Sequence, residues 1–174
     1  FVAYELSYFH GFGRVAIELI SELKKHNITG PILVHENTKP FTPLRNRTHF
    51  CLKHSPTSPL SRPDYTIHDH LKIREYSKNC DIIHFLTESG LSTTIFPYSK
   101  PHIVTTYGTW AIKPLTSNPI TKSIFNHAYN QAAAVVSISD YTKQRLAQLI
   151  PKAKHKTIKL GLALGNQHLP KTLN

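Results

Sequence analysis

Two glycines one residue apart lie near the start of the chain, directly before a run of helical spacing. Gly11, Gly13 and Ala16 fit the pattern G-x-G-x-x-A, with Phe12 and Arg14 among them. Glycine lets a backbone approach a ligand closely, and the first turn of a helix offers free N–H groups and a positive dipole to an anion. The segment therefore predicts a site for an anionic ligand, and a purely structural turn is the alternative.

This string also fits the fingerprint of dinucleotide-binding proteins, because Glu36 follows Ala16 by twenty residues at the end of a predicted strand. In that fingerprint the first glycine closes a tight turn at the end of the first strand. Here residues 7–10 intervene, and the loop is too long for the tight pyrophosphate turn. A dinucleotide cofactor stays a competing hypothesis, whereas the leading prediction includes no cofactor.

Tyr107, Gly108, Thr109 and Trp110 form the second candidate site. They follow a buried strand predicted at 102–106, so in a parallel sheet they lie at its carboxyl edge, where folds of this class place their ligands. Trp110 is the only tryptophan in the chain. Its ring either stacks on a ligand or packs against the loop and fixes it, and both roles stay open.

Ser139 is the third candidate, because it stands between a strand predicted at 134–138 and the helix that follows. A serine at this position either caps the helix through its side-chain oxygen or binds an anion. Asp140 suits the positive end of the same helix. Capping alone accounts for Ser139, and we keep anion binding as the alternative.

Metal and disulfide chemistry are not predicted. His68 and His70 flank Asp69, but no further ligand follows at a spacing typical of metal sites. Cys51 and Cys80 form no C-x-x-C pattern and are expected to be free thiols in a reducing compartment. We therefore expect no bound metal and a cytoplasmic protein.

Alternating strands and helices must position these residues. Strands are predicted at 1–6, 32–35, 81–86, 102–106, 134–138 and 157–162, and helices at 13–26, 70–78, 121–132 and 140–150. Several strands are continuous apolar runs, which is typical of a parallel sheet covered on both faces. The predicted fold is therefore α/β, a Rossmann-like doubly wound parallel sheet. Residues 37–63 and 107–119 are predicted as irregular loops, the first with at most one short strand at 50–53.

The net charge of +11 points to an anionic partner: nucleic acid, a membrane surface or a small substrate. Proteins that bind nucleic acid gather their basic residues on one element, whereas here lysine and arginine are spread along the chain. We expect no nucleic acid. A solvated basic surface and an anionic membrane surface stay open, and no apolar run is long enough to span a bilayer.

Four segments, in order, resemble the amino-terminal domain of glycosyltransferase family 4. They are residues 11–19, which begin Gly-Phe-Gly-Arg; 81–84, Asp-Ile-Ile-His; 100–110, which end Tyr-Gly-Thr-Trp; and 137–143, Ser-Ile-Ser-Asp-Tyr-Thr-Lys. The resemblance implies retaining enzymes built from two facing Rossmann-like domains, the GT-B architecture. In them the amino-terminal domain binds the acceptor and the carboxyl-terminal domain binds the nucleotide-sugar.

By this resemblance, residues 1–164 are the acceptor-side domain, 165–174 begin an interdomain linker, and the donor domain is absent from this sequence. Gly11 and Gly13 would line the cleft near the donor diphosphate and the acceptor, and Arg14 would favour an anionic group. The family commonly has a histidine where Tyr107 stands, next to the transferred sugar. Tyrosine still donates a hydrogen bond there, but it carries no positive charge at neutral pH.

We therefore predict the acceptor-binding domain of a retaining glycosyltransferase that is inactive as this isolated fragment. The whole enzyme would transfer a sugar from a nucleotide-sugar to a glycan or lipid-linked acceptor of the cell surface, without a metal. It would be peripheral on the inner face of the membrane. A non-catalytic binding module and an NAD(P)-type dinucleotide-binding domain are the alternatives.

Overall fold

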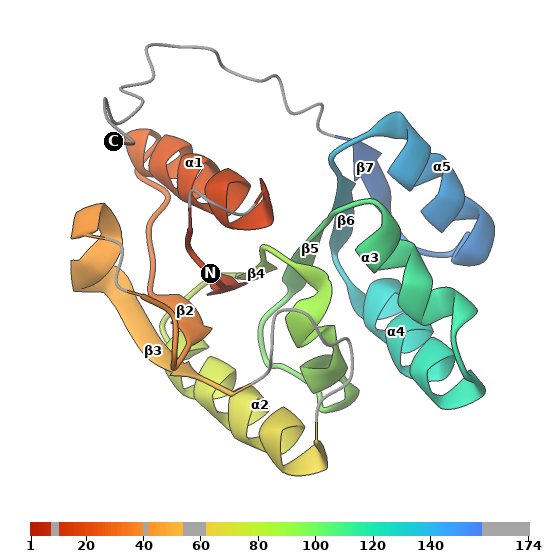
Figure 1. Ribbon diagram of the computed structural model, residues 1–174, viewed down its shortest axis with the longest axis horizontal. Coiled ribbons are helices and arrows are strands. Elements are labelled where there is room, and N and C mark those ends of the chain that lie inside the picture. The colour runs from red at the N-terminus through yellow and green to blue at the C-terminus, as the bar shows by residue number, and fades with distance from the viewer. Residues whose placement is uncertain (8–10, 40–41, 54–61, 158–174) are drawn as a thin grey trace, which may run out of the picture.

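The computed structural model describes residues 1–7, 11–39, 42–53 and 62–157. Its strands are β1 (Val2–Tyr4), β2 (Ile32–His35), β3 (Thr48–Leu52), β4 (Ile83–Phe85), β5 (His102–Thr106), β6 (Ala134–Ser137) and β7 (His155–Thr157). All neighbouring strands pair in parallel, in the order β3-β2-β1-β4-β5-β6-β7 (Figure 1). The α/β fold with a Rossmann-like parallel sheet is confirmed.

Helices connect these strands. The α-helices are α1 (Gly11–Lys25), α2 (Pro63–Ser77), α3 (Thr109–Ile112), α4 (Pro119–Gln131) and α5 (Asp140–Leu149), and the 3₁₀ helices are η1 (Thr42–Arg47), η2 (Glu88–Ile95) and η3 (Lys113–Thr116). Among the described residues, no helix has the length and apolar character needed to cross a bilayer.

The strand order changes direction at β1. The chain adds β2 and β3 on one side of β1, and then returns through α2 to place β4 on the other side. Val2 of β1 accordingly pairs with Leu33 of β2 and with Phe85 of β4. In doubly wound sheets, ligands bind outside the carboxyl ends of the strands at such a reversal. The segments that follow β1, β4 and β5 meet at this edge.

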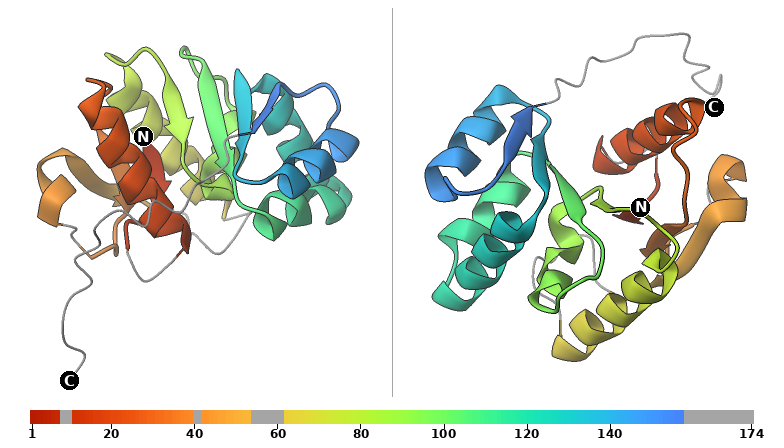
Figure 2. Two further views of the ribbon diagram at one scale, coloured as in Figure 1. Left: turned by 90° about the horizontal axis from the view of Figure 1, so that it is seen from above. Right: turned by 180° about the vertical axis from the view of Figure 1, so that it is seen from behind.

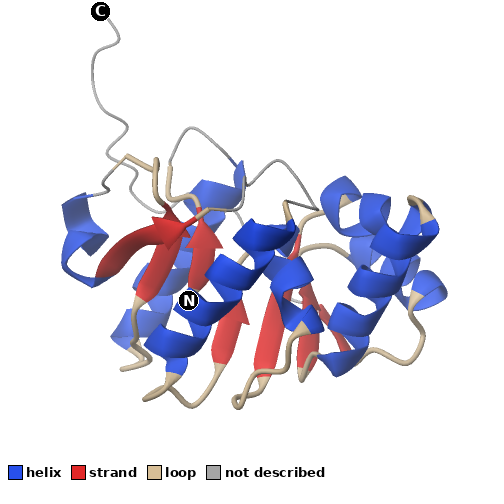
Figure 3. Ribbon diagram, turned by 90° about the horizontal axis from the view of Figure 1, so that it is seen from below, coloured by secondary structure: helices blue, strands red, loops and turns tan. Residues whose placement is uncertain are grey.

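Helices cover both faces of the sheet. Ala16, Ile17 and Ile20 of α1 are buried in one apolar cluster with Val34 of β2 and Leu44 of η1. The helices α2, α4 and α5 contribute to a second, larger cluster. Figure 2 shows α1 in front of the sheet when seen from above, and Figure 3 shows the helices of the other face in front when seen from below.

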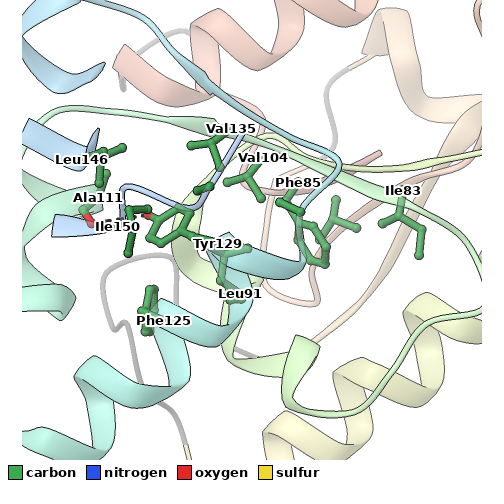
Figure 4. Close-up of a cluster of buried hydrophobic side chains, with 14 of the residues drawn as sticks. Ile83, Phe85, Leu91, Val104, Ala111, Phe125, Tyr129, Val135, Leu146 and Ile150 are labelled. Carbon is green, nitrogen blue, oxygen red and sulfur yellow. Dashed lines mark hydrogen bonds between the residues drawn. The ribbon is translucent and has the colours of Figure 1, made fainter. Parts of the chain in front are cut away.

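Aromatic side chains fill the larger cluster. Phe125 and Tyr129 of α4 are fully buried beside Phe85 of β4, Val104 of β5 and Val135 of β6 (Figure 4). Burying one side chain of this size contributes about 1.5–3 kcal/mol. This packing fixes α4 against the strands whose carboxyl ends carry the candidate site.

Three helices begin earlier than the sequence predicted. α1 begins at Gly11, α2 at Pro63 and α4 at Pro119. Proline suits the start of a helix because its missing N–H has no partner to lose there. α4 also has a capping residue, since Asn118 Oδ1 accepts the Thr121 N–H at 2.9 Å. Pro63 and Pro119, which the sequence analysis placed in loops, are therefore the first residues of helices.

The loop predicted at 107–119 was wrong, because α3 and η3 occupy most of it. These helices are four residues long and too short to show a helical period. Ala111 and Leu115 are buried in the larger cluster and hold them on the sheet. The sequence analysis also missed the 3₁₀ helices η1 and η2, which have six and eight residues.

The strand predictions differ mainly at their ends. β2 and β5 have the predicted bounds, whereas β4 is shorter than 81–86. Within 37–63, the short strand β3 is present at Thr48–Leu52. The last strand was predicted at 157–162 and is found at His155–Thr157; residues 158–162, the domain end at 164 and the linker at 165–174 lie outside the described residues.

Candidate functional site

The structure brings the first two predicted segments together at the carboxyl edge of the sheet. Phe12, in the first turn of α1, and Tyr107, directly after β5, make an edge-to-face ring contact with centroids 6.5 Å apart. These residues are 95 positions apart in the sequence. The start of α1 and the end of β5 therefore form one site.

The two glycines of α1 do different things. A Cβ on Gly13 would lie 2.8 Å from the backbone N and O of Ser7, so the helix can approach this backbone only without a side chain there. A Cβ on Gly11 would meet nothing within 4 Å. Gly13 is a packing requirement, whereas Gly11 is exposed at the start of the helix, where the positive end of the helix dipole favours an anionic ligand.

The connection from β1 to α1 is longer than the tight turn of a dinucleotide site. β1 ends at Tyr4 and α1 begins at Gly11, which leaves six residues between them. The glycines lie inside the first helical turn and do not close a turn at the strand end. The length of this connection therefore counts against the dinucleotide fingerprint.

Arg14 lies on the surface of α1. Its Nε donates to Oε1 of Glu18 at 2.9 Å, and both side chains are well exposed. An exposed pair at this spacing contributes little to stability. The structure holds the guanidinium along the helix and not over its N-terminus.

Tyr107 carries a buried hydroxyl that has no hydrogen-bond partner among the described residues. Burial raises the pKa of this phenol well above its ordinary value of 10, with the nearby Glu88 as a second cause. Most buried polar groups in proteins are hydrogen-bonded, so an unpaired one calls for an explanation. This hydroxyl is a free donor and acceptor within the candidate site.

The turn after Tyr107 depends on a glycine. Gly108 has a φ of 54°, in the left-handed region that side chains disfavour. Thr109 and Trp110 then begin α3 and are exposed. The ammonium of Lys113 lies 5.5 Å from the centre of the Trp110 ring. The ring therefore does not pack into the core, and its face contacts a lysine at the protein surface.

Ser139 caps α5. Its Oγ accepts the Thr142 N–H at 3.2 Å and lies 2.9 Å from Thr142 Oγ1. A cap of this kind contributes about 1 kcal/mol. The capping role is confirmed, and the oxygen is already used in it.

Glu88 was missed in the sequence and lies against this site. It begins η2 just after β4 and is only 7% exposed. Its Oε1 accepts the Tyr107 N–H at 2.5 Å. Burial raises the pKa of the carboxyl from 4.5 to about 7. The available signal was its position, three residues past a continuous apolar strand.

The His68–His70 segment has a structural role. Asp69 accepts hydrogen bonds from the Tyr4 hydroxyl at 3.2 Å and from the Lys53 N–H at 2.7 Å. His70 Nδ1 lies 3.2 Å from the carbonyl oxygen of Thr93. Over the described residues, no group of three His, Cys, Asp or Glu side chains is placed to hold a metal ion. Both cysteines are free thiols.

Comparison with known proteins gives one result for nearly the whole chain. The family model of glycosyltransferase family 4 matches residues 9–164, which include both the start of α1 and the turn after β5. No curated protein matches the sequence. The parallel sheet with helices on both faces has the architecture of a Rossmann-like half of a GT-B enzyme. The chain belongs to glycosyltransferase family 4.

Proposed function

We propose that this chain is the acceptor-binding domain of a retaining glycosyltransferase. The whole enzyme would transfer a sugar from a nucleotide-sugar to a cell-surface glycan or glycolipid. The observation that carries the proposal is the unpaired, buried hydroxyl of Tyr107 at the carboxyl edge of the sheet, in contact with the first turn of α1.

The two sides of this site suit two parts of the reaction. The exposed start of α1 offers the positive end of its helix dipole to the donor diphosphate. The Tyr107 hydroxyl offers one donor and one acceptor to a sugar hydroxyl. The described residues of the site contain no side chain placed as a nucleophile, which fits a reaction in which the leaving diphosphate helps to deprotonate the acceptor.

A sugar-transfer assay with the natural full-length protein tests this proposal. We expect transfer from a nucleotide-sugar to a lipid-linked or polysaccharide acceptor, and none with residues 1–174 alone. Tyr107→Phe should lower kcat/KM about tenfold, because one hydrogen bond of ordinary strength is lost. Tyr141→Phe is the matched control, since Tyr141 is an exposed tyrosine on α5. Full activity in Tyr107→Phe would remove this residue from the site.

A non-catalytic binding module is the second candidate, favoured by the tyrosine at position 107 where the family commonly has histidine. Such a module would bind an acceptor glycan with no transfer and no hydrolysis of any nucleotide-sugar. Thermal shift of the full-length protein separates a protein that binds a nucleotide-sugar from one that binds a dinucleotide. A nucleotide-sugar should raise the Tm and NAD(P) should not; the reverse result would favour the dinucleotide-binding alternative.

We further propose that the protein is cytoplasmic and contacts an anionic membrane surface, where its acceptor would be held. The net charge of +11 supports this contact. Each basic residue near anionic lipid adds roughly 1 kcal/mol of attraction. In a flotation assay we expect binding to vesicles that contain anionic lipid. Equal binding to neutral vesicles would contradict the electrostatic attachment.

A further inference from the structure

A buried carboxyl without a cationic partner lies beneath the candidate site. Buried acidic side chains in proteins are normally paired with a positive charge. Among the described residues, no lysine, arginine or histidine forms an ion pair with Glu88. Its carboxylate instead accepts the backbone N–H of Tyr107. The Tyr107 amide is therefore the contact that joins Glu88 to another element.

This contact fixes the shape of the turn that carries the site. Glu88 follows β4, and Tyr107 follows the neighbouring strand β5, so the hydrogen bond joins the ends of two strands. The next residue, Gly108, turns the chain into α3. The positions of the Tyr107 ring and of Trp110 therefore depend on where the Tyr107 amide is held.

We propose that Glu88 is the positioning residue of this site: as a carboxylate it holds the Tyr107 amide, and on taking up a proton it loosens the turn. The inference rests on the proposed function only for the role of Tyr107 as a ligand contact. A charged acceptor forms a stronger and shorter hydrogen bond than a neutral one, so the two protonation states hold the turn differently.

The surroundings of Glu88 place this change near neutral pH. Burial raises its pKa to about 7, so both forms are populated. Burial, and after it the negative charge of Glu88, raises the pKa values of Tyr107 and of Tyr129 from α4. The Tyr129 hydroxyl donates to the carbonyl oxygen of Ala111 in α3 at 3.3 Å. These two phenols stay neutral at pH 7, whereas the Glu88 carboxyl between them is partly ionised at that pH.

The other titratable groups packed on η2 contact its later residues. Tyr4 of β1 lies where a Cβ on Gly90 would be, and His70 of α2 and Tyr98 both reach Thr93. Burial raises the pKa values of Tyr4 and Tyr98 and lowers that of His70.

Burial acts in the opposite direction on the buried histidines of the two joined strands, because it lowers their pKa values. Burial lowers the pKa of His84 in β4 to about 4, and it also lowers that of His102 in β5. The transition near pH 7 in this turn is assigned to Glu88, whose pKa burial raises to about 7, and the Glu88→Gln variant tests that assignment.

The direct test is an NMR titration of the Tyr107 amide. In the wild-type chain, its ¹H and ¹⁵N shifts should follow one transition near pH 7. Glu88→Gln, which holds the amide with a neutral oxygen at every pH, should abolish the transition. Glu36→Gln, which changes an exposed glutamate, should keep it. A Tyr107 amide that does not titrate in the wild type, or that still titrates in Glu88→Gln, would overturn the proposal.

Trp110 reports whether the change reaches the site. It is the only tryptophan, so its fluorescence comes from one position three residues beyond Tyr107. We expect the emission to change with the same midpoint as the Tyr107 amide and to be independent of pH in Glu88→Gln over that range. Emission that stays constant while the amide titrates would overturn the positioning role. Neither measurement uses sugar transfer, so a failure of the proposed function leaves both readable.

Discussion

Two buried carboxyls on the same side of the sheet have opposite surroundings. Asp69 of α2 is fully buried and accepts hydrogen bonds from the Tyr4 hydroxyl and from the Lys53 N–H, with His68 Nδ1 also 3.0 Å away. Glu88 accepts the backbone N–H of Tyr107, and burial raises its pKa. Donors from β1 and from the residue after β3 make Asp69 part of the framework, whereas Glu88 lies against the candidate site. Perturbed carboxyls of this second kind are typical of functional sites.

Removing the framework carboxyl should have the largest effect. Asp69→Ala removes the carboxylate that accepts hydrogen bonds from the Tyr4 hydroxyl and the Lys53 N–H, so we expect the free energy of unfolding to fall by about 3–5 kcal/mol. Urea denaturation measures this. Asp64→Ala is the matched control, because Asp64 is an exposed carboxyl of the same helix paired with Arg62. If Asp69→Ala lowers the free energy of unfolding no more than Asp64→Ala does, Asp69 has no framework role that distinguishes it from Glu88.

Glu88→Gln should instead stabilise the protein, and only at high pH. Because the folded-state pKa of about 7 lies above the ordinary 4.5, the wild type loses stability as the pH rises through this interval. The full difference corresponds to about 3 kcal/mol. We expect Glu88→Gln to unfold at a higher Tm than the wild type above neutral pH and at the same Tm below about pH 4.5. A difference that does not change with pH would contradict the raised pKa.

The same contrast between framework and ligand edge separates the two glycines of α1. Gly13→Ala forces a methyl group against the Ser7 backbone, and we expect it to cost about 1–3 kcal/mol. Gly11→Ala meets no atom and should be neutral or stabilising by up to about 1 kcal/mol. Parallel urea titrations compare them, and equal losses would show that the close approach at Gly13 is not needed.

Two tyrosines give the smallest and most specific comparison. Tyr4→Phe removes a donor from Asp69 and should cost about 1 kcal/mol. Tyr107→Phe removes a hydroxyl that has no partner, so stability should not fall. Ligand binding should show the reverse order, because we assign only Tyr107 to the site. Loss of stability in Tyr107→Phe would mean that its hydroxyl has a structural partner.

Local patterns in the sequence were sufficient for the fold and for one capping residue. Continuous apolar runs predict buried parallel strands because both faces of such a sheet are covered, and this holds for β2 and β5 at their exact bounds. Ser139 caps α5 through atoms three residues apart, so its role is readable from its neighbours. The four ordered segments likewise sufficed to indicate the family, which the match over 9–164 establishes.

Contacts between distant residues could be decided only by the tertiary structure. The sequence placed Phe12 and Tyr107 at the same edge, but their contact depends on how α1 packs on the sheet. The burial of Glu88 depends on α4 and on the end of β5, whereas its position after an apolar strand indicates only that it lies near the edge of the sheet. A side chain's desolvation is set by the elements that cover it. The sequence therefore determined which segments carry the site, and the packing of distant elements decided which carboxyl beside it has a raised pKa.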